Sequence, residues 1–181
     1  MNDYDVVYKN NIEYNEEVSE KFIYTDKIFE NFIPLSDRIV DLGCGKGHYC
    51  RRYSSKGYNI IGVEPSDYCC ENFLKDVEHY NSDIIEFSEN NNKYDSFICM
   101  DVLEHIEYGD IDQNLECLKS ISNFGIIGIA NHKEIVCGRR LHKIIENNNW
   151  WESKLLQHFK YADLICDIIS NRFFIFIVKN T

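Results

Sequence analysis

The sequence predicts a single α/β domain with an open, mostly parallel sheet. Short β-branched runs alternate with stretches of helical periodicity along most of the 181 residues. The run from Arg38 to Asp41 ends in a turn with three alternate glycines, and a polar–apolar segment begins at His48. Near the carboxyl end, two apolar runs flank Asn171-Arg172, which fits a hairpin turn. These observations predict one domain over residues 1–181, with an α/β core over 36–181.

The elements can be placed in order along the chain. Residues 1–35 are acidic and aromatic, and we expect one or two helices there that lead to Pro34. Strands are expected at 37–42, 58–63, 77–81, 95–100 and 124–130, with helices between them. The last of these strands is short and apolar, as a central buried strand is. Apolar residues at helical spacing predict a helix over 150–160, and the hairpin strands are expected at 164–170 and 173–179.

Charge and composition limit the classes of partner and compartment. The formal net charge is −11, and the basic residues form only scattered pairs such as Arg51-Arg52. A nucleic-acid partner is therefore not expected, because phosphate binding needs a basic face. The sequence shows no signal peptide and no apolar run of membrane-spanning length. Its eight cysteines include no C-x-x-C pair, which indicates buried thiols in a reducing compartment. We expect a cytoplasmic protein without a membrane partner.

The glycine turn predicts a ligand site. Gly43, Gly45 and Gly47 lack a Cβ, so the backbone there can adopt positive φ and approach a ligand closely. The helix that follows has free N–H groups at its start, which suit the polar part of a nucleotide-like cofactor. The spacing differs from the G-x-G-x-x-G dinucleotide fingerprint, since His48 stands where the third glycine would be. The alternative is a turn that is glycine-rich only for tight packing.

An acid at the end of the second predicted strand supports the ligand hypothesis. Glu64 follows the first glycine, Gly43, by 64 − 43 = 21 residues. An acid about 20 residues after such a loop grips a nucleoside ribose, because a carboxylate accepts hydrogen bonds from two hydroxyls. Pro65 fits the first turn of the next helix. We therefore expect Glu64 to bind ribose.

Four motifs in this order resemble those of class I S-adenosylmethionine (SAM) methyltransferases. They are the glycine turn after Asp41, the strand ending in Glu64, Asn81-Ser82-Asp83-Ile84, and the run Tyr94–His105, and together they cover residues 38–106. The last motif is similar to that of the ubiquinone-type O-methyltransferases. The resemblance implies a Rossmann-like fold with a seven-stranded, mostly parallel sheet, a terminal antiparallel hairpin and helices on both faces. It also implies SAM as cofactor and S-adenosylhomocysteine (SAH) as product.

The resemblance assigns cofactor-binding residues by position. The glycine turn would hold the methionine part of SAM, Glu64 the ribose, and the third motif the adenine. Asp83 has a second interpretation as an ordinary helix cap. Residues 1–35 would fold over the cofactor as a lid. The full cofactor-binding set is Asp41, Gly43, Cys44, Gly45, Gly47, Glu64, Pro65, Asp83, Ile84, Met100 and Asp101.

The candidate catalytic residues are Glu104, His105 and His132, which follow the fourth and fifth predicted strands. Ligands of open α/β sheets bind at this carboxyl edge, and His142 is placed similarly. The fourth-strand motif departs from that of enzymes that methylate nucleobase amines, which favours a hydroxyl of a small molecule. His105 is then the candidate base or acceptor-orienting residue. The alternative is that Glu104-His105 merely begins a helix.

A metal-assisted version uses the same residues. Asp101, Glu104 and His105 have the spacing D-x-x-E-H, similar to the E-x-x-E-H metal set of the small-RNA 2′-O-methyltransferases. The shorter Asp101 replaces the first Glu of that pattern, and no metal ligand is assigned from the sequence.

Residues 131–151 are expected to overhang the pocket and recognise the acceptor, with Arg139 and Arg140 available for an anionic group. Trp151 is expected to pack on the sheet. Two rival functions remain at this point: a catalytically silent SAM-binding module that regulates a partner, and an NAD-binding protein.

Overall fold

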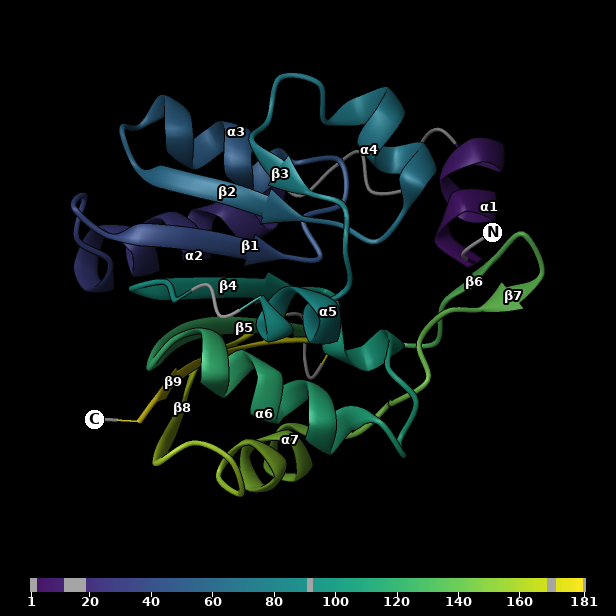
Figure 1. The fold of residues 1–181 in the computed structure, drawn as a ribbon. Helices are drawn as coiled ribbons and strands as arrows, with labels where there is room; N and C mark the ends of the chain where they lie inside the picture. The colour runs from purple at the N-terminus through teal and green to yellow at the C-terminus, as the bar shows by residue number, and fades with distance from the viewer. Residues whose placement is uncertain (1–2, 12–18, 91–92, 169–171, 181) are drawn as a thin grey trace.

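The computed structural model describes residues 3–11, 19–90, 93–168 and 172–180, and these contain a seven-stranded sheet with helices on both faces (Figure 1). The strand order is β3-β2-β1-β4-β5-β9-β8. Strands β1 to β5 pair in parallel, and β9 runs antiparallel to both β5 and β8. The strands are β1 (Arg38–Leu42), β2 (Asn59–Val63), β3 (His79–Tyr80), β4 (Ser96–Met100), β5 (Phe124–Ala130), β8 (Tyr161–Ile168) and β9 (Phe173–Lys179).

The helices lie between the strands, as the alternation of the sequence predicts. A separate two-stranded hairpin, β6 (Ile135–Val136) and β7 (Arg139–Arg140), follows β5. The helices are α1 (Asp3–Asn10), α2 (Ser19–Phe32), α3 (His48–Ser55), α4 (Asp67–Phe73), α5 (Ile84–Glu89), the 3₁₀ turn η1 (Leu103–His105), α6 (Ile111–Ile121) and α7 (Asn148–Leu155). None of the helices within the described ranges is long and apolar enough to cross a lipid bilayer.

The predicted fold class is confirmed, and three elements differ from their predicted bounds by more than one residue. β3 has only two residues, because a turn from Leu74 to Val77 precedes it and Asp83 caps the next helix. The helix predicted over 150–160 begins and ends earlier, since Asn147 caps it and its C-cap is Leu156. β8 begins at Tyr161, three residues before the expected start of the strand. Of the turn predicted at Asn171-Arg172, Asn171 lies outside the described residues, and Arg172 directly precedes β9.

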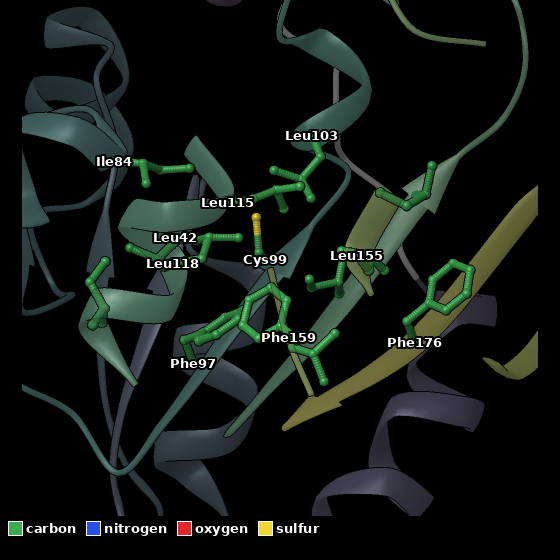
Figure 2. Close-up of a cluster of buried hydrophobic side chains, with 14 of the residues drawn as sticks. Leu42, Ile84, Phe97, Cys99, Leu103, Leu115, Leu118, Leu155, Phe159 and Phe176 are labelled. Atoms are coloured by element: carbon green, nitrogen blue, oxygen red, sulfur yellow. The ribbon is translucent and has the colours of Figure 1, made fainter. Parts of the chain in front are cut away.

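The core has two layers, one on each face of the sheet. One layer packs the sheet against α5, α6 and α7, and Figure 2 shows Phe97, Leu115 and Leu155 converging there. The other packs the opposite face against α2, α3 and α4, with Phe29 stacked on Tyr53 at a ring separation of 3.4 Å. Trp151 is fully buried in the first layer, as expected. Burial on both faces explains why β5 is apolar throughout.

The parallel strands bring their carboxyl ends to one edge of the sheet. The arrowheads of β1, β2 and β4 point to this edge in Figure 1, and α1 and the β6–β7 hairpin lie beyond it. The turns after β1, β2 and β4 therefore face one another. This is the edge at which ligands of open α/β sheets bind.

Asn147 should stabilise the start of α7. Its side chain accepts a hydrogen bond from the backbone N–H of Trp150 at 2.9 Å. We expect Asn147→Ala to lower the free energy of unfolding by about 1 kcal/mol, the usual cost of losing an N-cap. Asn149→Ala is the matched control, because Asn149 is exposed on the same helix and alanine has the higher helix propensity. Urea unfolding of both variants tests this, and equal stabilities would contradict it.

Candidate functional site

A cavity of about 190 Å³ lies at the carboxyl edge of the sheet. Its walls come from α1, from the ends of β1, β2 and β4, and from the starts of α5 and α6. Six of the predicted cofactor residues line it: Gly43, Glu64, Pro65, Asp83, Ile84 and Asp101. His105 lines it too. The remaining lining residues, which sequence reasoning did not select, are Tyr4, Tyr8, Val63, Ser82, Val102, Ile106 and Asn114.

The glycine turn has the conformation that its composition predicts. Gly43, Gly45 and Gly47 have φ angles of 76°, 52° and 75°. A Cβ at Gly43 would lie 2.5 Å from Cγ2 of Val102, so the turn after β1 packs directly against the turn after β4. The N–H groups of Gly43 and Cys44 both donate to the carbonyl of Val63, at 2.8 and 3.0 Å. The turn is therefore a rigid floor that only glycine can form at Gly43.

Glu64 connects this turn to the end of β2. One carboxylate oxygen accepts the N–H of Gly45 and the other accepts that of Ser66, both at 3.0 Å. Burial raises the pKa of Glu64 to about 7, although these two hydrogen bonds lower it. Each oxygen has a second lone pair, so the carboxylate can still accept two hydroxyls from the cavity. This geometry suits the predicted ribose site.

Five of the predicted cofactor residues lie outside the cavity lining. Gly45 and Gly47 shape the turn from within, and Asp41 is buried beneath it. Burial raises the pKa of Asp41 to about 7, against a hydrogen bond from the Cys50 thiol that lowers it. The other two residues, Cys44 and Met100, pack in the core on the α3 face. These five residues therefore shape the glycine turn or pack behind it, and they do not form the cavity wall.

The thiol of Cys44 is held in its protonated form. A hydrogen bond with Cys50, and then burial, raise the pKa of Cys44 well above its usual value. Its Sγ lies where a Cβ on Gly62 would come within 2.5 Å. Cys44 is therefore a compact packing residue and not a reactive thiolate.

The third motif both caps a helix and lines the cavity. Oδ1 of Asp83 accepts the N–H of Glu86 at 2.8 Å, so the cap interpretation of Asp83 is correct. Asp83 and Ile84 also face the cavity, beside Ser82. The helix start thus presents a carboxylate and an apolar side chain to the cavity, which suits the predicted adenine site.

Asp101 stands at the end of β4 in an unusual conformation. It is one of two described non-glycine residues with positive φ, at 57°. Its Oδ2 forms an ion pair with Lys21 of α2, and its buried Oδ1 has no hydrogen-bond partner among the described residues. Positive φ in a non-glycine residue is costly and clusters at functional sites. The Lys21 contact ties α2 to the cavity, and no local pattern around Lys21 predicts it.

Glu104 and His105 lie on η1, and their side chains occupy different environments. Glu104 is fully buried, and its Oε1 accepts the N–H of Ala130 at 2.7 Å, which joins η1 to β5. Burial, with the nearby Asp101, raises the pKa of Glu104 to about 8. Burial, followed by the effect of His142, lowers the pKa of His105 to about 4. His105 is therefore a neutral imidazole at pH 7, and Glu104 holds η1 in place.

Three histidines meet beside the cavity. The ring of His142 lies 4.7 Å from that of His105 and 4.8 Å from that of His132. Nε2 of His142 is 3.2 Å from Oε2 of Glu134, and its Nδ1 is 2.6 Å from the carbonyl oxygen of His132. Two sets of potential ligand atoms lie within 4.8 Å of one another: Glu104 with His105 and His142, and His132 with Glu134 and His142.

The structure groups the potential metal ligands differently from the D-x-x-E-H pattern seen in the sequence. Glu104 and His105 do come together, but their partner is His142, and the Asp101 carboxylate instead pairs with Lys21. Glu134 was not selected from the sequence, because nothing in its local pattern sets it apart. Arg140 donates to the carbonyls of His142 at 2.8 Å and Lys143 at 3.2 Å, so it braces the hairpin.

Helix α1 closes the cavity from the outer side. Oδ1 of Asp5 accepts hydrogen bonds from Oγ of Ser66 at 2.6 Å and from the N–H of Tyr68 at 3.1 Å. This fixes α1 to the start of α4. Tyr4 and Tyr8 then line the cavity, and the Tyr4 ring stands edge-on to His105 at 5.6 Å.

Comparison with known proteins bears on this geometry. Residues 14–164 match a family described as a methyltransferase domain. The chain belongs to this family. The predicted membership of the class I SAM-dependent methyltransferases is thereby confirmed. A SAM-dependent methyltransferase from Archaeoglobus fulgidus has the same fold, with a TM-score of 0.67 at 16% identity over 88% of this chain and 96% of the other.

Two further similarities concern different acceptor atoms. A ubiquinone biosynthesis O-methyltransferase of Rickettsia bellii is 32% identical over 91 residues, which are 45% of this chain and 37% of that protein. The methyltransferase chain thus spans little more than a third of this relative. The structure of a Burkholderia thailandensis 1,6-didemethyltoxoflavin N1-methyltransferase with SAH has a TM-score of 0.68 at 11% identity, over 98% of this chain and 88% of the other.

Proposed function

We propose that this methyltransferase domain transfers the methyl group of SAM to a hydroxyl oxygen of a small molecule. When bound, SAM supplies a sulfonium methyl group that a nucleophile can take. Glu64 would accept the ribose hydroxyls, Asp83 and Ile84 would meet the adenine, and the Gly43 turn would face the methionine part. Gly43, Glu64, Asp83 and Ile84 all line the same cavity, which supports this fit. SAH is the expected product.

The observation that carries the proposal is the place of His105. A neutral imidazole lines the cavity that also contains the Glu64 carboxylate. Its buried Nδ1 has no hydrogen-bond partner among the described residues. A neutral ring can orient an acceptor hydroxyl and take its proton as the methyl group is transferred. Because Glu104 fixes η1 to β5, we assign it a positioning role.

The similarity to an O-methyltransferase supports oxygen as the acceptor atom. The acidic charge of the chain supports a small molecule over nucleic acid. His132 is not part of the cavity lining, so we propose that it lies near the bound acceptor without contacting it. A cytoplasmic location is proposed from the cysteine content, because eight cysteines without a C-x-x-C pair suit a reducing compartment.

The direct test incubates the chain with isotope-labelled SAM and fractionated cell extract, followed by mass spectrometry of any compound that gains the label. We expect one fraction to yield a methyl ether together with SAH. A methylated nitrogen would contradict the choice of oxygen. If SAH binds by calorimetry but no fraction is methylated, the chain is a SAM-binding module without transfer activity.

We also propose that α1 acts as the lid expected from the family resemblance. Asp5→Ala removes the acceptor that holds α1 to α4, at a cost of about 1.5–3 kcal/mol for a hydrogen bond to a charged group. We expect faster hydrogen exchange in residues 3–10 and about tenfold weaker SAH binding, because the walls formed by Tyr4 and Tyr8 would be lost. Lys9→Ala, on an exposed position of the same helix, is the control. Unchanged exchange in Asp5→Ala would contradict the lid.

A further inference from the structure

The β6–β7 hairpin brings together side chains that the sheet alone would leave apart. It pairs Ile135 with Arg140 and Val136 with Arg139, and its turn residues Cys137 and Gly138 have φ angles of 50° and 75°. Positive φ at both positions is typical of the tight I′ turn. The N–H of Leu141 then donates to the carbonyl of Glu134 at 3.1 Å. The chain therefore returns so that His142 meets His132 and Glu134.

The three side chains present the atoms that a metal ion requires. One ligand atom from each of His132, Glu134 and His142 lies within 4.8 Å of the other two. Nε2 of His142 and Oε2 of Glu134 are 3.2 Å apart. Two ligands of a tetrahedral ion, each at about 2.1 Å from it, are separated by about 3.4 Å. The pair is therefore already at the spacing that one shared ion demands.

A hydrogen bond at Nδ1 of His142, the ring nitrogen that does not face Glu134, orients the imidazole ring. Its Nδ1 lies 2.6 Å from the carbonyl oxygen of His132, and a carbonyl can only accept, so Nδ1 carries the proton. This leaves Nε2 as the coordinating nitrogen, facing Glu134. A metal-binding histidine almost always donates its other N–H to a carbonyl or carboxylate in this way. Nδ1 of His132 is itself buried without a hydrogen-bond partner among the described residues.

We propose that His132, Glu134 and His142 bind a divalent transition-metal ion, Zn²⁺ or an ion of similar chemistry, beside the acceptor side of the cofactor cavity. Two histidines and one glutamate form a ligand set of catalytic zinc sites, which leave further coordination positions open. Imidazole ligands favour such ions over Mg²⁺, which prefers oxygen. His105, whose ring lies 4.7 Å from that of His142, connects the ion site to the cavity.

Access of an ion from solvent favours this ligand set over the alternative set of Glu104, His105 and His142. The Glu134 side chain is 26% exposed, so an ion can enter from solvent, whereas Glu104 is fully buried and one of its oxygens is bound to Ala130. An ion at the proposed set would offer an open position to an oxygen atom of the acceptor. It would thereby hold that oxygen near His105 and lower the pKa of a bound hydroxyl.

Ion binding can be measured without SAM or acceptor, so this site is tested separately from methyl transfer. The tag-free chain, stripped of metal with a chelator, is titrated with Zn²⁺ by calorimetry and with Co²⁺ by visible absorption. We expect one ion per chain and the intense d–d bands of four- or five-coordinate Co²⁺. Glu134→Gln and His142→Asn each remove a proposed ligand, so each should weaken Zn²⁺ binding by more than the roughly 10- to 100-fold that loss of an outer-shell partner costs. SAH affinity of each variant confirms that it folds.

His158→Asn is the matched control, because His158 also contacts two carboxylates, Asp112 and Glu116, both at 2.8 Å. Its Zn²⁺ affinity should equal that of the unmodified chain. Absence of one-to-one Zn²⁺ and Co²⁺ binding in the unmodified chain overturns the proposal, whatever the variants do. Binding that survives Glu134→Gln but is lost in Glu104→Gln overturns the ligand set. SAH binding without ion binding would leave the proposed function intact.

Discussion

Replacing Glu64 with alanine is expected to weaken SAH binding by about a hundredfold or more. Hydrogen bonds to a charged group contribute about 1.5–3 kcal/mol each, and the carboxylate would accept two ribose hydroxyls. The variant also leaves the N–H groups of Gly45 and Ser66 without their acceptor, so the glycine turn loses its connection to β2. Calorimetric titration with SAH measures the effect. Glu71→Ala, an exposed acid on α4, is the control for loss of charge.

The same carboxyl predicts how cofactor affinity depends on pH. Burial raises the pKa of Glu64 to about 7, and only its ionised form accepts two hydroxyl donors. Affinity is therefore highest about one pH unit or more above 7 and falls as the pH drops through 7. With a pKa of about 7, SAH should bind about tenfold more weakly at pH 6 than at pH 8. Glu64→Gln should remove this dependence, and a dependence that persists in that variant belongs to another group.

Replacing His105 with alanine is expected to lower turnover by about 10²- to 10⁴-fold, the range for losing a general base. SAH affinity should change little, since the assigned ribose and adenine contacts come from other residues. The measurement is the single-turnover rate of methyl transfer with the extract fraction that the unmodified chain methylates. This contrast between rate and affinity distinguishes a role at the acceptor from a structural one.

Two controls accompany this prediction. His79→Ala removes a histidine on β3, outside the cavity lining, and should leave the rate unchanged. His105→Gln retains a polar side chain, so it tests whether orientation alone suffices. A rate in His105→Ala equal to that of the unmodified chain would remove His105 from catalysis and leave it as part of η1.

Features set by local chemistry could be predicted from the sequence. The glycine turn and the distance from Gly43 to Glu64 follow from backbone requirements that few other residues satisfy, and both are found where expected. The succession of strands along the chain follows from the alternation of apolar runs, and β5 matches its predicted range residue for residue. For Asp83 the sequence allowed two interpretations and could not choose between them, because the same side chain caps α5 and lines the cavity.

Features that depend on distant contacts could not be predicted. The pairing of Lys21 with Asp101 joins residues 80 positions apart, and Asp5 reaches Ser66 across 61 positions. Neither residue has a local pattern that marks it. Glu134 and His142 meet only because the chain reverses at Cys137 and Gly138. A turn with Cys at its first central position lacks the usual Asn-Gly or Asp-Gly signal, so the hairpin was not expected.

The strand order places the proposed nucleoside contacts in one half of the sheet, β3-β2-β1, and the proposed acceptor contacts in the other half, β4-β5-β9-β8. The contacts assigned to the cofactor's nucleoside come from β2 and the segment after β3, whereas those assigned to the reacting hydroxyl follow β4 and β5. The hairpin after β5 adds to the second half without entering the main sheet. Exchange of residues 131–147 between related chains should therefore change which acceptor is methylated while the affinity for the cofactor's nucleoside stays the same.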